Sequence, residues 1–259
     1  GPINNGLIAL AAAAGATSKI KLISTITLAP LYPPALLAKQ AASLDTVSGG
    51  RFSLGIGVGG EFAKEFEACG VSVNERGART NEALEVMQRL WTEDNVEFNG
   101  RFTTLPGVTL DPKPDNIPVW ISGRSDAAMK RCAAYGSGWL PYMYTPDMLR
   151  DSLTKISNSR DPARPAIDPG LFIFCAVHPD RETALHMASD RLSKQYNQDF
   201  SKLVGKYAIA GKPDDCIARI KEYIDAGATT IVFNSACPQH HVEENERLLA
   251  TEVLNSFAR

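Results

Sequence analysis

Short apolar stretches alternate along the chain with segments in which apolar residues recur every three or four positions. The apolar stretches are rich in β-branched residues, which favours buried strands. We expect strands at residues 20–28, 52–58, 118–122, 138–140, 171–177 and 229–233. Strands that are apolar throughout are typical of a parallel sheet covered by helices.

The segments between these strands carry one apolar face each and predict helices. We expect helices at residues 3–16, 35–47, 61–69, 75–91, 126–135, 146–157, 179–195, 214–226 and 243–257. Pro34 suits the first turn of the second helix, and Gly49 and Gly50 suit its end. Asn99 and Gly100 predict the turn of a hairpin within residues 95–110.

The alternation of strand and helix runs without a linker and indicates a single domain over residues 1–259. Gly55 to Gly60 fit the dinucleotide pattern G-x-G-x-x-G, but that α/β fold needs an acid at the end of its second strand. The acids that follow, Glu75 and Glu82, fall at the start of or within a predicted helix. We therefore favour a (β/α)8 TIM barrel, in which the given chain lacks the first one or two βα units.

Composition narrows the function classes. The 259 residues are 44% hydrophobic and 22% charged, with a net charge of −2, which argues against nucleic acid or an anionic membrane as partner. No apolar run approaches the roughly 18 residues of a membrane span. The five cysteines are widely spaced, so neither a disulfide framework nor a zinc site is expected, and a cytoplasmic location fits.

Several motifs, taken in order, resemble one known family. They are LDTVSGGRFSLGIGVGG, ERGARTNEALEVMQRLW, PVWISGRS and GKPDDCIARIKEYIDAGATTIVF. Together they resemble the bacterial-luciferase-like superfamily from about residue 7 to residue 233. The resemblance implies a TIM barrel that binds coenzyme F420, in the class that is most similar, or reduced FMN, as in other branches.

The resemblance places a bulge at Ser24, Thr25 and Ile26, where the first predicted strand ends. In F420-dependent relatives this place carries a cis peptide and backs the cofactor ring. The resemblance thus implies a cis Thr25–Ile26 bond and cofactor contacts from all three residues. A plain buried strand is the alternative.

Glu61 directly follows the glycines of the second predicted strand. A carboxylate there can hydrogen-bond a cofactor or substrate, or move a proton, and the resemblance implies a catalytic role. Lys64 stands where relatives carry an asparagine that helps to bind the cofactor. The structural alternative is an acid in the first turn of a helix, where the helix dipole favours it.

Ser122, Gly123, Arg124 and Ser125 lie between a predicted strand and a helix. Amide groups at a helix N-terminus bind phosphate, Gly123 permits close approach, and Arg124 can add charge. We expect this loop to hold the phosphate side of the cofactor. The alternative is a simple turn in which Ser125 or Asp126 caps the helix.

Gly138, Trp139 and Leu140 match a strand end that lines the cofactor in relatives. Tyr142 and Met143 follow and are expected to line a substrate pocket. Core packing is an equal alternative for Trp139.

Four further residues are expected to serve other purposes. Arg51 and Arg76 are interpreted as structural residues paired to carboxylates, and His240 and His241 as surface residues. No metal site is expected.

The favoured function is hydride transfer between F420 and a small organic substrate, which the protein orients against the cofactor. The alternatives are a monooxygenase that uses reduced FMN and oxygen, and a non-catalytic barrel that binds flavin or deazaflavin. Resemblance alone implies a homodimer.

Overall fold

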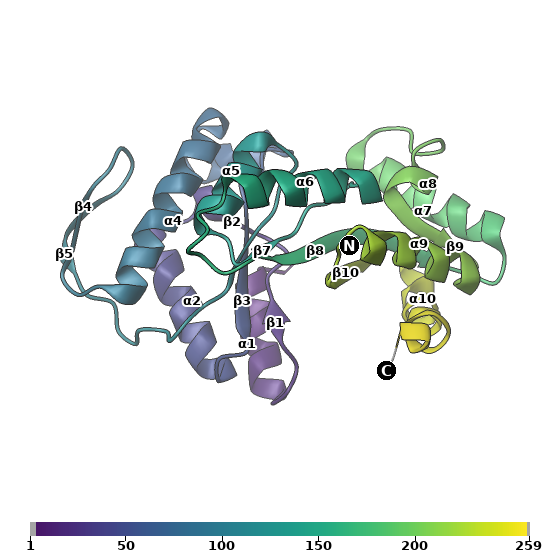
Figure 1. The fold of residues 1–259 in the computed structure, drawn as a ribbon, viewed down its shortest axis with the longest axis horizontal. Helices are drawn as coiled ribbons and strands as arrows, with labels where there is room; N and C mark the ends of the chain where they lie inside the picture. Colours follow the sequence, from purple (N-terminus) through teal and green to yellow (C-terminus); the bar gives the residue numbers. More distant parts are fainter. Residues whose placement is uncertain (1–3, 258–259) are drawn as a thin grey trace. The chain divides into compact units, whose positions relative to one another are not determined.

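The structure is a computed structural model that describes residues 4–257. Its contacts gather into two compact units (Figure 1). The N-terminal unit contains residues 4–139 and 160–167, and the C-terminal unit contains residues 140–159 and 168–257.

The sheet of the N-terminal unit is parallel, as predicted. Strand β3 (Phe52–Gly57) pairs with β1 (Leu22–Ile23) and β2 (Thr27–Leu28), and on its other edge with β6 (Val119–Ile121), which pairs with β7 (Gly138–Trp139). Every residue of β3 except Ser53 is buried. The predicted strand at 20–28 is wrong as a single element, because residues 24–26 separate β1 from β2.

The helices of this unit are α1 (Gly6–Ala16), α2 (Pro34–Ser48), α3 (Ala63–Ala68), α4 (Arg76–Thr92) and α5 (Asp126–Tyr135), with short 3-10 turns η1 (Ala29–Leu31) and η2 (Val73–Glu75). Pro34 opens α2, and Gly49 ends it with φ of 66°, the left-handed conformation that glycine adopts without strain. Helix α5 has the predicted bounds. The expected start of the first helix at residue 3 lies outside the described residues.

The predicted hairpin is present as β4 (Val96–Asn99) and β5 (Thr104–Val108), which pair antiparallel. It lies along α4 (Figure 1). Glu82 of α4 accepts hydrogen bonds from the backbone N–H of Arg101, at 2.8 Å, and of Phe102, at 3.0 Å. This carboxylate therefore fixes the hairpin tip against the helix.

Arg51 joins three segments through its guanidinium. It donates to the carbonyl oxygens of Ala14, Thr17, Ile20 and Ser48 and to the hydroxyl of Thr17, at 2.6–3.1 Å. Arg76 donates to the carbonyl of Val73 at 2.7 Å. Both arginines bind carbonyl oxygens at chain turns. Within residues 4–257 neither forms an ion pair with a carboxylate, so the expected carboxylate partners are wrong.

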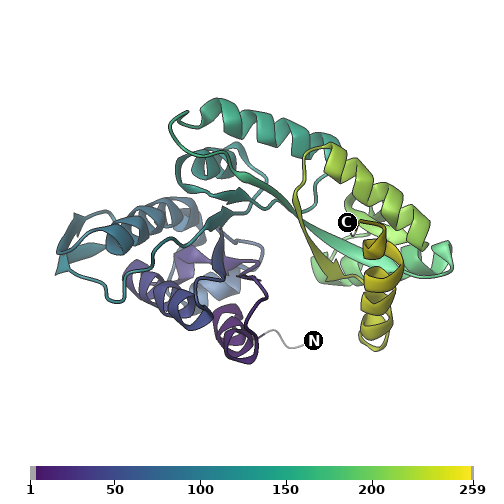
Figure 2. The ribbon, with the colours of Figure 1, turned by 60° about the horizontal axis from the view of Figure 1, so that its bottom comes forward.

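The C-terminal unit is built on β8 (Asp168–Val177), which pairs in parallel with β9 (Ala208–Gly211) and β10 (Thr230–Ser235) (Figure 2). Its helices are α6 (Pro146–Ser159), α7 (Arg181–Tyr196), α8 (Val204–Tyr207), α9 (Pro213–Asp225) and α10 (Val242–Leu248). The single helix expected at 243–257 is wrong. After the 3-10 turn η3 (Gln239–His241), α10 passes into a π-helical turn η4 (Leu249–Val253) and a 3-10 turn η5 (Leu254–Phe257).

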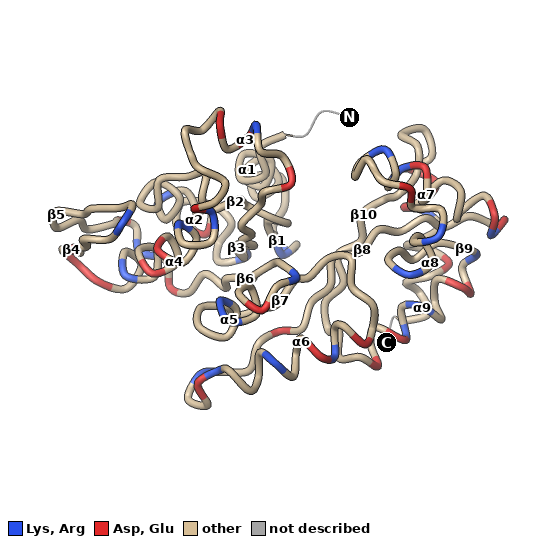
Figure 3. The backbone as a smooth tube through the Cα atoms, turned by 90° about the horizontal axis from the view of Figure 1, so that it is seen from above, with Lys and Arg blue, Asp and Glu red and all other residues tan. Residues whose placement is uncertain are grey.

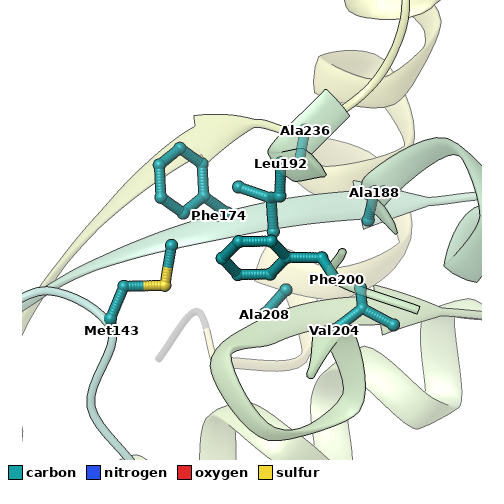
Figure 4. Close-up of a cluster of buried hydrophobic side chains, with 9 residues drawn as sticks. Met143, Phe174, Ala188, Leu192, Phe200, Val204, Ala208 and Ala236 are labelled. Atoms are coloured by element: carbon teal, nitrogen blue, oxygen red, sulfur yellow. The ribbon is translucent and has the colours of Figure 1, made fainter. Parts of the chain in front are cut away.

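The core of this unit packs small residues around aromatic rings (Figure 4). Phe174 of β8 meets Tyr196 edge-on with ring centroids 6.1 Å apart, and Tyr196 contacts Phe200 at 5.7 Å. Such pairs add about 0.5–1.5 kcal/mol beyond the area they bury. Leu192, Val204 and Ala208 complete the cluster, which draws α8 and β9 into the core.

Charge is spread over both units without a region of one sign (Figure 3). Lys and Arg segments alternate with Asp and Glu segments along the helices, often as i,i+3 or i,i+4 pairs. Among residues 4–257, no helix is long and apolar enough to cross a membrane.

Candidate functional site

The carboxyl ends of neighbouring parallel strands bring the predicted residues of the N-terminal unit together. Residues 24–26 follow β1 and precede β2, Glu61 follows β3, Ser122 follows β6, and Trp139 ends β7. The amide of Ser122 donates to the carbonyl of Ile56 at 2.8 Å, which continues the ladder past the end of β6. These segments therefore line one edge of the sheet, the edge at which barrel enzymes place their chemistry.

Residues 24–26 form a bulge. Ile23 pairs with Ser53 and Thr27 with Ile56, so four residue steps on one strand oppose three on the other. The extra residue breaks the ladder, as a β-bulge does. The Thr25–Ile26 peptide is cis, so the expected bulge and the expected cis bond are both confirmed, whereas contact of these residues with a cofactor stays a prediction.

Ser24 holds the bulge against β3. Its side-chain oxygen accepts from the amide of Gly55 at 2.9 Å and donates to the carbonyl of the same residue at 3.1 Å. The residue is only 4% exposed, whereas Thr25 is exposed and Ile26 half-buried. Thr25 is thus the residue of the bulge most open to a ligand.

Gly55 and Gly57 make room for the bulge. A Cβ atom on Gly55 would lie 1.9 Å from the carbonyl oxygen of Ser24, and one on Gly57 would lie 1.9 Å from the Cδ1 atom of Ile26. Ser24 and Ile26 of the bulge therefore occupy the space beside these two glycines. The sequence signal for the Ser24–Gly55 contact is the pair of glycines in β3, which lies opposite the strand that the bulge interrupts.

Glu61 is exposed and directly follows two glycines of the turn after β3. Gly59 and Gly60 have φ of 61° and 110°, and a Cβ atom on Gly60 would lie 2.8 Å from Nε of Arg76. Helix α3 begins at Ala63, two residues later than predicted, so Glu61 precedes its first turn. Glu61 therefore lies on the loop between β3 and α3.

The loop from Ser122 to Ser125 leads into α5. Ser122 is 5% exposed, while Arg124 and Ser125 are exposed. Ser125 is the N-cap of α5, and its hydroxyl accepts from the amide of Ala128 at 3.3 Å. Gly123 has φ of 150°, and a Cβ atom there would lie 2.6 Å from that of Ala128. The alternative that Ser125 caps the helix is confirmed. Phosphate binding by the loop stays a prediction.

Gly138 and Trp139 end the sheet of this unit. A Cβ atom on Gly138 would lie 2.3 Å from the ring of Trp120, so only glycine fits there without a shift. Trp139 is fully buried and Leu140 is 1% exposed. Contact between these residues and a cofactor stays a prediction.

Tyr142 and Met143 belong to the C-terminal unit. Tyr142 forms a parallel bridge with Phe172. Met143 is 7% exposed and packs in the cluster around Phe174 (Figure 4). The carbonyl of the next residue, Tyr144, accepts the hydroxyl of Tyr223 at 2.7 Å. The expected contact of Tyr142 and Met143 with substrate stays a prediction.

Three histidines of the C-terminal unit, His178, His240 and His241, lie near one another. The rings of His240 and His241 are 4.6 Å apart, and those of His178 and His241 are 6.4 Å apart. His240 is exposed and His241 half-buried. Within residues 4–257, no three His, Cys, Asp or Glu side chains are grouped so that they can hold a metal ion.

Comparison with known proteins gives the family. Residues 4–230 match the luciferase-like monooxygenase family, and the chain belongs to that family. An uncharacterized protein of Mycobacterium tuberculosis (strain ATCC 25618 / H37Rv) is 36% identical over 156 residues, 60% of this chain and 54% of that protein. The matched region thus spans about half the length of that relative.

Relatives with described activities cover more of the chain. The F420-dependent glucose-6-phosphate dehydrogenase of Microbacterium testaceum (strain StLB037) is 26% identical, over 93% of this chain and 80% of that protein. The crystal structure of monooxygenase RslO1 from Streptomyces bottropensis superposes with a TM-score of 0.82 at 26% identity, over 98% of this chain and 83% of that one. An F420-dependent secondary alcohol dehydrogenase superposes with a TM-score of 0.84 at 21% identity, over 98% of this chain and 83% of that one. The fold is therefore the α/β barrel type of this family.

Proposed function

We propose that the protein is an F420-dependent oxidoreductase that transfers hydride between the cofactor and a small organic substrate. The observation that carries the proposal is the bulge at residues 24–26, which lies at the same sheet edge as Glu61 and the loop before α5. The similarity to F420-dependent dehydrogenases over most of the chain supports the choice of cofactor.

The residues at this edge fit a flat ring with a phosphate-bearing tail. Thr25 is exposed, and the neighbouring Ser24 is fixed by two hydrogen bonds, so this segment offers a rigid surface for a ring. The exposed N-terminus of the ten-residue helix α5, with Arg124 beside it, suits a phosphate group. F420 supplies two-electron hydride exchange at its ring, and the chain supplies binding and orientation.

Glu61 is a residue near this edge whose carboxylate can hold or move a proton. It is exposed at the end of β3, on a loop whose two glycines, Gly59 and Gly60, take up positive φ. A carboxylate that accepts the hydroxyl proton of a bound alcohol would assist hydride loss from the same carbon. We assign Glu61 this role.

A second candidate is a monooxygenase that uses reduced FMN. Similarity to monooxygenase RslO1 favours it, since the identity and coverage match those of the F420-dependent relatives. Lys64 also favours it, because the resemblance places an asparagine there in F420-dependent proteins. The two candidates differ in which cofactor the same sheet edge accepts.

Cofactor titration separates them. Each cofactor is added to the protein while its fluorescence is followed. Tighter binding of F420 than of FMN supports the proposal, the reverse order favours the monooxygenase, and binding of neither overturns both. Arg124→Gln should weaken F420 binding about tenfold, the loss of one charge-assisted contact worth about 1.4 kcal/mol. Arg150→Gln is the matched control, because Arg150 is an exposed arginine of α6 that pairs with Asp147.

A further inference from the structure

A pocket in the N-terminal unit lies outside every residue assigned to the cofactor. Its volume is about 480 Å³, within the range of small-molecule sites. Three segments form its walls: residues 29–35 around η1, residues 69–71 after α3, and residues 102–105 at the hairpin tip, with Arg79 of α4 between them.

The walls are largely apolar and stiff. Pro30, Pro33 and Pro34 fix the backbone of one wall, and Phe102 and Leu105 form the other. Proline has a locked φ and loses little conformational freedom on binding. The pocket is thus preformed for an apolar group.

Arg79 is the one charged residue among the residues that line the pocket. Its Nε and Nη2 atoms bind Glu75 at 3.1 and 3.0 Å, and its guanidinium carbon lies 4.3 Å from the centre of the Phe102 ring. Within residues 4–257, Nη1 has no hydrogen-bond partner. Glu75 and the Phe102 ring thus hold the Arg79 side chain in place, and its Nη1 atom can still donate a hydrogen bond to a ligand.

The nearby carboxylates are engaged elsewhere. Glu75 also binds Arg101 at 3.1 Å, so two guanidinium groups share its charge. Glu82 directs both oxygens to the backbone amides of Arg101 and Phe102. Neither acid lines the pocket, so the charge that faces a ligand is positive.

Tyr32 adds a second polar group to the pocket, in the wall formed by residues 29–35. Its phenol oxygen accepts from Nδ2 of Asn5 at 3.1 Å, and its O–H has no acceptor within the described part of the chain. A carboxylate has two oxygens, so it can accept from an arginine edge and from a phenol.

We propose that this pocket binds a small monocarboxylate whose short apolar chain lies between the proline wall and Phe102, with the carboxylate on Nη1 of Arg79. One guanidinium edge matches one carboxylate in charge and geometry. The pocket is a second binding site, independent of the cofactor proposal.

Cys69 provides a direct measurement of occupancy. It lines the pocket and is exposed, whereas the other four cysteines are buried. The rate at which iodoacetamide alkylates Cys69 is measured by peptide mass spectrometry, with no cofactor present. Hexanoate, hexanol and hexylammonium are compared, and N-acetylcysteine corrects for any effect of each probe on the reagent.

Hexanoate should slow alkylation several-fold in a saturable manner, while hexanol should need about tenfold higher concentration and hexylammonium should give no protection. Arg79→Gln should weaken hexanoate protection about tenfold, and Tyr32→Phe a few-fold. The matched control is Arg89→Gln, because Arg89 of α4 also pairs with a glutamate four positions away, Glu93, but lies outside the pocket. Equal protection by hexanol and hexanoate, protection by neither, or unchanged hexanoate protection in a folded Arg79→Gln variant would each overturn the proposal.

Discussion

Replacing Gly55 tests how the bulge is held. The Cβ atom of Gly55→Ala would lie 1.9 Å from the carbonyl oxygen of Ser24 and 3.1 Å from its carbonyl carbon, far inside an ordinary contact of about 3.5 Å. The neighbour is backbone, so it cannot rotate away as a flexible side chain would. The bulge or β3 must move instead.

The expected cost has two parts. Overpacking of a buried site costs about 1–3 kcal/mol. Displacement of Ser24 also breaks two buried hydrogen bonds to Gly55, each worth about 0.5–1.5 kcal/mol. We therefore expect Gly55→Ala to lower the free energy of unfolding by about 2–6 kcal/mol.

Urea unfolding followed by circular dichroism measures this loss. With a slope near 3 kcal/mol per M, the urea midpoint should fall by about 0.7–2 M. Ser24→Ala isolates the hydrogen bonds and should cost less than Gly55→Ala. Gly15→Ala is the matched control, because no atom lies within 4 Å of its Cβ position in α1, and it should stabilise by about 0.5–1 kcal/mol. A loss below about 1 kcal/mol for Gly55→Ala would refute the reasoning.

Three further changes test other parts of the molecule. Glu61→Gln should lower kcat at least about 100-fold while F420 affinity stays within about threefold, and an unchanged kcat in steady-state assays would remove Glu61 from the chemistry. Arg51→Lys should cost about 2–4 kcal/mol in thermal unfolding, because an ammonium group cannot replace five guanidinium bonds; a neutral result would contradict that. Burial raises the pKa of Tyr223 to about 12, so its contribution to stability is complete below about pH 10 and is lost as the pH rises through 12. Tyr223→Phe should flatten that alkaline decline in urea midpoints, and an equally steep decline would show that other groups cause it.

The sequence was most informative where local signals agreed with the fold. Helix α5 begins and ends where predicted, because Ser125 caps it and an apolar face follows. Strand β9 was missed, since Ala-Ile-Ala-Gly has no run of β-branched residues and its strand state comes from pairing with β8. Tertiary contacts decided that element.

The candidate site was only partly readable. The cis Thr25–Ile26 bond followed from family resemblance, whereas the two-way contact of Ser24 with Gly55 depends on register between distant segments. The pocket around Arg79 was not predictable, because its walls come from segments separated by up to about 70 positions along the chain. No local pattern encodes such an assembly.

The way the bulge is built has a consequence for protein engineering. Its backbone is specified by Ser24 together with Gly55 and Gly57 of the neighbouring strand, while Thr25 is exposed. Position 25 can therefore be randomised in a library without disturbing the framework that presents it. Selection at this one codon offers a way to retune ligand preference while keeping the scaffold intact.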